Sequence, residues 1–257
     1  MDTPLRPQGT DTVANRLKVG LNMAYPGLGA LAVGAFPTPD SAAFIRKVYA
    51  WMCVGLVISA AVAFWAAHTP TVAQFVMNPF VFFGLLLIEL AVGLFLGNLV
   101  HRFSSNTSIV LFVIYSGLNG LTLSIIFFLF EIGSIVQVFL LTAGLFGAMS
   151  VYGHVTKRDL TTAGHFASMA LWGLVFATAT NFILKSDRSS LILAYCGVAV
   201  FVLLTASDTQ KLRSMYEMAQ TEGPDGEKKE AINGALALYL DFINLFLKLL
   251  RILGRRR

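Results

Sequence analysis

Long apolar runs separated by short polar segments dominate this chain. A helix needs roughly 20 mostly apolar residues to cross the hydrocarbon core of a membrane. Six runs meet that length, and each is read as a membrane-spanning helix. They cover about residues 48–67, 79–99, 108–130, 134–153, 162–184 and 189–207.

A seventh apolar segment, about residues 233–254, is interrupted by polar side chains. Asp241, Asn244, Lys248 and Arg251 follow helical spacing and share one stripe. Such stripes face a bundle interior or a wet cavity. Two interpretations remain: a re-entrant segment, or a full crossing surrounded by the other six helices. We favour the central position, which predicts an all-α polytopic membrane protein, a seven-helix bundle with its last helix central.

Two polar segments interrupt this pattern. Residues 1–43 are rich in Gly and Pro without a sustained apolar run, which predicts a disordered cytoplasmic N-terminal arm before a transmembrane domain over 44–257. Without a hydrophobic signal peptide in that arm, the first span is expected to serve as an uncleaved insertion signal. The second segment, about 209–232, contains "EGPDGEKKE". This stretch lacks the alternating ligands of an EF-hand and is predicted to be a solvated loop.

Composition supports the membrane interpretation, and charge sets the orientation. The chain is 56% hydrophobic and 13% charged, with a mean hydropathy of +0.71. Lys and Arg favour cytoplasmic loops. Here they concentrate in the arm and in the second, fourth and sixth connections, whereas only Lys185 and Arg188 lie on the other side. The N-terminus is therefore predicted to be cytoplasmic. The net charge of +5 lies at membrane edges and does not indicate a nucleic-acid partner.

Asp208 ends the sixth span, and Asp241 lies in the seventh segment. The seventh segment leaves the cytoplasm near Asn233, so Asp241 lies roughly 12 Å along its helix. A tilt, or a start one turn later, brings the two carboxyls to similar depth. Two carboxyls with little water cannot both ionise cheaply, so they hold one proton and titrate as a unit. This predicts a pH-dependent latch that opens as pH rises, with a transient calcium site at its oxygens.

The remaining polar residues offer weaker signals. Glu89 lies in the middle of the second span, where it either bonds a neighbouring helix or belongs to an ion pathway. The histidines lack metal-binding spacing, so no bound metal and no cofactor are expected. The chain carries no nucleophile arrangement, and "LYLD" around Asp241 differs from the Gly-x-Gly-Asp of intramembrane aspartyl proteases. We therefore expect no enzymatic activity.

Four stretches of the chain resemble the bacterial branch of the Bax inhibitor-1 family (transmembrane Bax inhibitor motif proteins). They are "LNGLTLSIIFF" at 118–128, "TAGLFGAMSVYGHVTKRDL" at 142–160, "SDTQKL" at 207–212 and "LYLDFINLFLKLLRILG" at 238–254. The resemblance covers nearly everything from about residue 43 onward. It implies seven helices with the last one central, and a location in a bacterial inner membrane.

The resemblance also implies roles for individual residues. Asp208 and Asp241 match the family's paired aspartates, described as a pH sensor in a calcium-leak pathway. A basic partner expected near the cytoplasmic end of the second helix falls on Val100 in an ungapped alignment, and Arg102 lies two residues on. Glu89 matches an acidic position of relatives, whereas Ser207 stands where many relatives have Tyr.

Two functions follow as expectations. The first is a pH-sensitive leak pathway for a cation, with Ca²⁺ as the expected ion, gated by the paired aspartates. The second is a non-transporting regulator that binds other membrane proteins, such as a membrane protease, because relatives are associated with such partners. A deletion of residues 1–40 that abolished function but not flux would favour the second.

Overall fold

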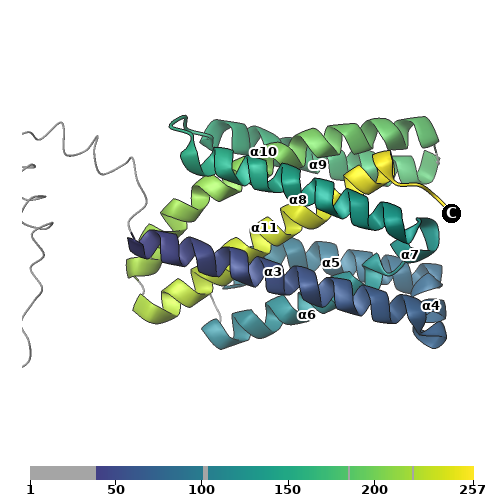
Figure 1. Cartoon of the computed structure of the whole chain (residues 1–257), viewed down its shortest axis with the longest axis horizontal. Coiled ribbons are helices and arrows are strands. Elements are labelled where there is room, and N and C mark those ends of the chain that lie inside the picture. Colours follow the sequence, from purple (N-terminus) through teal and green to yellow (C-terminus); the bar gives the residue numbers. More distant parts are fainter. Residues whose placement is uncertain (1–38, 101–103, 185, 222) are drawn as a thin grey trace, which may run out of the picture. The chain divides into compact units, whose positions relative to one another are not determined.

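The structure is a computed structural model that describes residues 39–100, 104–184, 186–221 and 223–257. These residues form helices and no β-strand, apart from an isolated bridge between Phe130 and Arg256. The helices are α3 (Pro39–His68), α4 (Pro70–Met77), α5 (Pro79–Val100), α6 (Ser105–Leu123), α7 (Ile126–Leu129), α8 (Ile132–Val155), α9 (Thr161–Leu184), α10 (Asp187–Thr221) and α11 (Gly223–Leu253) (Figure 1). The predicted arm lies outside the described residues except for 39–43, which form the first residues of α3 rather than disordered chain.

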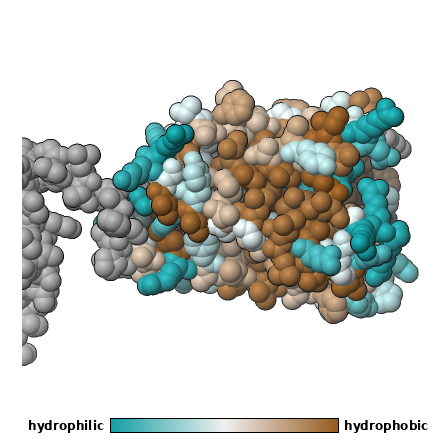
Figure 2. All heavy atoms as spheres, turned by 45° about the horizontal axis from the view of Figure 1, so that its top comes forward, coloured by the Kyte–Doolittle hydropathy of each residue, from teal (hydrophilic) through white to brown (hydrophobic). Residues whose placement is uncertain are grey.

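Five of these helices are long and apolar enough to span a membrane. They are α3, α6 with α7, α8, α9 and α10, and the bent pair α4–α5 could make a sixth span. Large apolar side chains point outward from them, including Val57, Leu140, Met169 and Phe176. Figure 2 shows this apolar surface as a band with hydrophilic residues gathered toward both ends of the bundle. Such a continuous apolar surface fits lipid rather than water.

The connection predicted between the first two spans is itself helical. Residues Pro70–Met77 form α4, which meets α5 at an angle of 78° around Asn78. Pro79 starts α5, and the side chain of Asn78 accepts a hydrogen bond from the backbone N–H of Phe80. A proline suits the first position of a helix because the N–H it lacks would have no partner there. Most of the segment between the first two predicted spans is therefore a short helix rather than an irregular loop.

The stretch predicted as a solvated loop also proved helical. α10 continues to Thr221, well beyond the predicted span, and α11 begins at Gly223, about ten residues before the predicted segment. Gly223 has φ +76°, a conformation that glycine adopts without strain, and the chain reverses there. Asp225 lies in the first turn of α11, where the helix dipole favours an acid.

α11 is one unbroken helix of 31 residues, about 46 Å long at 1.5 Å per residue. It packs against α5, α6, α8 and α10, and most of its side chains are buried. It begins beside the end of α10, and the C-terminus lies at the opposite, α4 end of the bundle (Figure 1). There Glu131 N–H donates to Arg255 O and Arg257 N–H donates to Leu129 O. A re-entrant segment would reverse within the bundle, and α11 does not.

Candidate functional site

Small residues hold α10 close to two neighbouring helices around Asp208. A Cβ at Gly153 of α8 would overlap the backbone carbonyl of Ala206, and one at Gly164 of α9 would overlap the Ser207 hydroxyl. The helices therefore approach each other more closely here than side chains would allow. Small residues serve this purpose generally in membrane helices. The positions just before Asp208 are thereby fixed against α8 and α9.

The α8–α9 connection is fastened to α10 just past Asp208. The amide of Gln210 donates to Arg158 O and accepts from Leu160 N–H, both at 2.8 Å. Arg213 Nη2 donates to His154 O, also at 2.8 Å. These contacts hold the end of α8 and the start of α9 against one face of α10.

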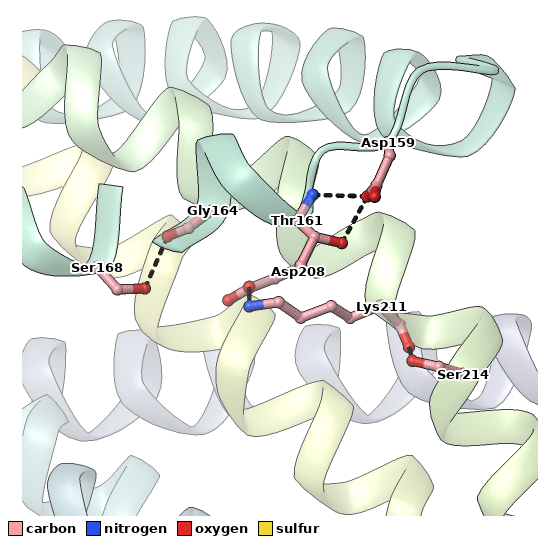
Figure 3. A network of polar contacts seen from close by, with 7 residues as sticks. All are labelled: Asp159, Thr161, Gly164, Ser168, Asp208, Lys211 and Ser214. Atoms are coloured by element: carbon pink, nitrogen blue, oxygen red, sulfur yellow. Dashed lines mark hydrogen bonds and ion pairs between the residues drawn. The ribbon is translucent and has the colours of Figure 1, made fainter. Parts of the chain in front are cut away.

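Asp159 lies in the same connection, two residues before the start of α9. Its Oδ1 accepts hydrogen bonds from the backbone N–H and the hydroxyl of Thr161 (Figure 3). These two hydrogen bonds, that of the hydroxyl above all, lower the pKa of the Asp159 carboxyl. The carboxylate is therefore the stable form at neutral pH and caps α9.

The Asp208 side chain, which is 19% exposed, forms an ion pair with the next turn of its own helix. Lys211 Nζ lies 2.8 Å from Asp208 Oδ1, at i+3 spacing (Figure 3). Lys211 is itself 47% exposed, so water reaches this pair. Screening by that water makes the pair weak in energy. Water therefore reaches the Asp208 carboxyl as well.

Asp241 lies on α11 within electrostatic range of Asp208 and Lys211. Unlike Asp208, it is almost fully buried, at 5% exposure. Its Oδ2 is buried and accepts no hydrogen bond from the protein. A buried polar atom without a partner costs about 1–3 kcal/mol. Lys211 thus forms an ion pair with the partly exposed carboxyl of Asp208 and acts at longer range on the buried carboxyl of Asp241.

Among the contacts of the described residues, no hydrogen bond joins the two carboxyls. Asp208 Oδ1 accepts from Lys211 instead. The next residues of the polar stripe lie toward the other end of α11. Asn244 donates to Leu240 O in its own helix, the methylenes of Lys248 lie against Gly197 of α10, and Arg251 is exposed.

Glu89 belongs to a different polar cluster. It is buried on α5 and accepts hydrogen bonds from Thr122 and Asn119 of α6. Among the contacts of the described residues, none joins Glu89 to Asp208 or Asp241. Arg102 falls outside the described residues. Of the predicted site residues, the structure therefore brings Asp208 and Asp241 together and leaves Glu89 apart.

Sequence reasoning missed two contributors to these clusters. Lys211 was counted only as a loop charge, although its i+3 spacing from Asp208 would have paired the two. No role was predicted for Tyr239. Its hydroxyl lies 2.7 Å from Ser59 Oγ, and Ser59 also bonds Ser116 O of α6. No sequence signal links Tyr239 to Ser59, because they lie 180 residues apart.

The carboxyl pair alone would not make a resident metal site. Over the described residues, no group of three or more His, Cys, Asp or Glu side chains is placed to hold a metal ion. Ca²⁺ takes six to eight oxygen ligands. Two carboxyls would leave most of that shell to water.

Comparison with known proteins gives one consistent result. Residues 41–257 match the family described as "Inhibitor of apoptosis-promoting Bax1". The inner membrane protein YbhL of Escherichia coli K12 is 46% identical over 215 residues, covering 83% of this chain and 92% of the relative. An uncharacterized protein of Borreliella burgdorferi is 40% identical, with 83% and 92% covered. An uncharacterized membrane protein of Streptococcus pyogenes serotype M1 is 35% identical, with 82% and 92% covered.

Proposed function

The chain belongs to the Bax inhibitor-1 family of membrane proteins, and we propose that it is a pH-sensitive cation leak gated by Asp208 and Asp241. One observation carries the proposal. A buried carboxyl, Asp241, has an oxygen without a hydrogen-bond partner beside a second, partly exposed carboxyl. Intramembrane acids are costly and are found where ions or protons pass.

In this proposal the bundle has seven spans in an inner membrane, with the N-terminus in the cytoplasm. Five single helices and the bent pair α4–α5 account for six spans. α11 is the seventh, enclosed by α5, α6, α8 and α10, which it contacts. Its polar stripe then faces protein and water rather than lipid, and Asp241 lies where an ion crossing the bundle would meet it.

The gate works through one shared proton. At low pH a proton on the pair lets one carboxyl donate to the other, which neutralises half of the charge and satisfies the buried oxygen of Asp241. Asp208, which solvent reaches, passes the proton to water as pH rises. Two carboxylates then repel each other, and the repulsion separates α10 from α11. Lys211 offsets part of this repulsion.

The open state attracts cations for the same reason. Two carboxylates with one lysine leave net negative charge at the end of the proposed pathway. Divalent oxygen-seeking ions such as Ca²⁺ gain most from paired carboxylates. Binding by only two side chains is weak enough to release the ion, which conduction requires.

The test is flux through purified protein in liposomes. Ca²⁺ entry is followed with an enclosed dye at pH 6, 7 and 8 for the wild type and for Asp208→Asn/Asp241→Asn. Asp159→Asn, which removes an acid from the neighbouring connection, is the matched control. We expect wild-type and control flux to rise with pH and the double variant to show no response.

The contrary outcomes are equally clear. If the double variant kept the wild-type pH response, Asp208 and Asp241 would not be the gate. No flux above empty liposomes at any pH would overturn the leak. The family's association with membrane proteases would then make the regulator reading the next to test, by co-purification with membrane partners.

A further inference from the structure

A cavity of about 400 Å³ lies at the C-terminal end of α11, against α7. One wall is apolar and includes Ile126, Leu129 and Phe130. The other carries Lys248 and Arg251 of α11 together with Arg256 of the tail. This cavity lies at the opposite end of α11 from the start that packs beside α10, and it contains none of the proposed gate residues.

The three basic groups of the cavity lack acidic partners. Among the contacts of the described residues, no ion pair involves Lys248, Arg251 or Arg256. Lys248 is partly buried, and its methylenes pack against Gly197. Glu131, which follows Phe130 of the apolar wall, is exposed, and its backbone N–H donates to the tail. A partly buried charge without an acidic partner, such as that of Lys248, is costly, so an anion at this place would lower the free energy.

The tail that carries Arg256 is held in place. Arg255 N–H donates to Ser134 Oγ at 2.9 Å, and Arg257 N–H donates to Leu129 O at 3.1 Å. Between them, Arg256 pairs with Phe130 in the isolated bridge. Arg256 is thus fixed at the rim of the cavity by backbone contacts on both sides.

The apolar wall continues onto the lipid-facing surface. Leu129 is 53% exposed and Ile132 is 46% exposed. A ligand that filled this place would meet cations at one end and apolar side chains along its length. Inorganic phosphate would interact only with the cationic wall.

We propose that this cavity binds the headgroup of an anionic phospholipid, with the phosphate against Lys248, Arg251 and Arg256 and an acyl chain along Leu129 and Ile132. With the N-terminus in the cytoplasm, the lipid belongs to the outer leaflet. The proposal also accounts for Arg251 and Arg256 at an end of α11 where the usual charge bias would exclude them. It stands whether or not the protein conducts ions.

The tail supplies a matched pair of variants for the test. Arg251→Gln/Arg256→Gln removes two charges from the cavity. Arg255→Gln/Arg257→Gln removes two charges from the same tail, and neither of these side chains lines the cavity. All four arginines are exposed or at the rim, so both variants keep the packed core.

The experiment measures lipid binding to full-length protein in detergent by native mass spectrometry. Phosphatidylglycerol is titrated, with phosphatidylcholine as the zwitterionic comparison. We expect phosphatidylglycerol to bind the wild type and the tail control alike, and the cavity variant at least about tenfold more weakly. Phosphatidylcholine should bind all three proteins weakly.

Three results would overturn the proposal. If phosphatidylglycerol binding weakened equally in both double variants, the lipid would be attracted to the basic tail as a whole and not to the cavity. If phosphatidylcholine bound the wild type as tightly as phosphatidylglycerol does, the negative charge of the lipid would have no role in binding. If inorganic phosphate raised the melting temperature as much as phosphatidylglycerol did, the apolar wall would have no part. Should the cavity variant fail to fold, Arg256→Glu against Arg257→Glu asks the same question with single changes.

Discussion

At the scale of single residues, the account depends on how differently Asp208 and Asp241 meet water. Asp208 is within reach of solvent and of Lys211, whereas Asp241 keeps a buried oxygen without a partner. Because charge is expensive in the buried position, a proton shared by the pair favours the closed arrangement. In the proposed gate, the exposed member provides the route by which that proton leaves. The same side chain thus has different proposed roles in the buried position and in the exposed one.

Lys211→Met should shift the pH response rather than abolish it. The ammonium group favours ionised carboxylates, so without it the pair keeps its proton to higher pH. The midpoint of the flux–pH curve is expected to rise by about one pH unit. Lys228→Met removes the charge of an exposed lysine and should leave the midpoint unchanged. A midpoint that fell in Lys211→Met would contradict the electrostatic role of this residue.

Tyr239→Phe should destabilise the bundle modestly. The variant removes the hydrogen bond between the tyrosine hydroxyl and Ser59 Oγ while keeping the buried ring, at a cost of about 1 kcal/mol. Tyr195 is 57% exposed on α10, and Tyr195→Phe is the control. Unfolding by denaturant in detergent micelles measures both. Equal stabilities would show that the Tyr239 hydroxyl contributes nothing to the fold.

The residues of the site were only partly predictable. Asp208 and Asp241 could be placed near each other because helical rise converts sequence distance into depth. Lys211 was missed because its charge was assigned to a loop, whereas α10 in fact continues past it. The unpartnered oxygen of Asp241 could not be predicted at all. It depends on which side chains α10 and α11 present to each other in the packed bundle.

At the scale of helices, close approach around Asp208 depends on glycine. Gly153 and Gly164 leave α8 and α9 close to Ala206 and Ser207 of α10. α8 also carries Gly147, around which nothing lies within 4 Å of an added Cβ. Gly147 and Gly153 therefore differ in environment although they belong to one helix.

Gly153→Ala should be destabilising, and Gly147→Ala should not. The new methyl at position 153 would press on the backbone carbonyl of Ala206, which can move only with α10, at a cost of about 1–3 kcal/mol. At position 147 the methyl has open space and alanine favours the helix. Thermal unfolding in detergent compares them. Similar losses in both variants would show that α8 and α10 are not in close contact there.

The boundaries of the helices were harder to predict from the hydropathy pattern than the spans themselves. The apolar runs predicted the spans well, because a hydrophobic stretch of membrane length has few other uses. The polar stretch that forms the start of α11 was predicted as a loop, and the segment of α4 was left between two predicted spans, yet both are helical. Their helicity comes from a proline or an acid at the first turn and from packing on neighbouring helices, which polarity alone does not report.

At the scale of the whole molecule, α11 determines the topology. Its 31 residues run without a break to a tail bonded to the α7–α8 connection. Both ends of the chain would lie on one side of the membrane if this helix were re-entrant. In the proposed seven-span arrangement they lie on opposite sides.

Reporter fusions test that arrangement. Alkaline phosphatase, active only outside the cytoplasm, should be active when fused after Arg257 and inactive when fused after Arg158. Green fluorescent protein, fluorescent only in the cytoplasm, should give the opposite pattern at the same positions. Fluorescence from the fusion after Arg257 would contradict the seventh crossing and place the proposed lipid site in the inner leaflet.

The most direct test of the gate compares Asp208→Asn, Asp241→Asn and the double variant in liposome Ca²⁺ flux between pH 6 and pH 8. A shared proton makes the two carboxyls one titrating unit. Each single variant should therefore lose the pH response as completely as the double variant does. If each single variant lost only part of the response and the parts added up in the double variant, the aspartates would act independently, and the shared-proton gate would be wrong.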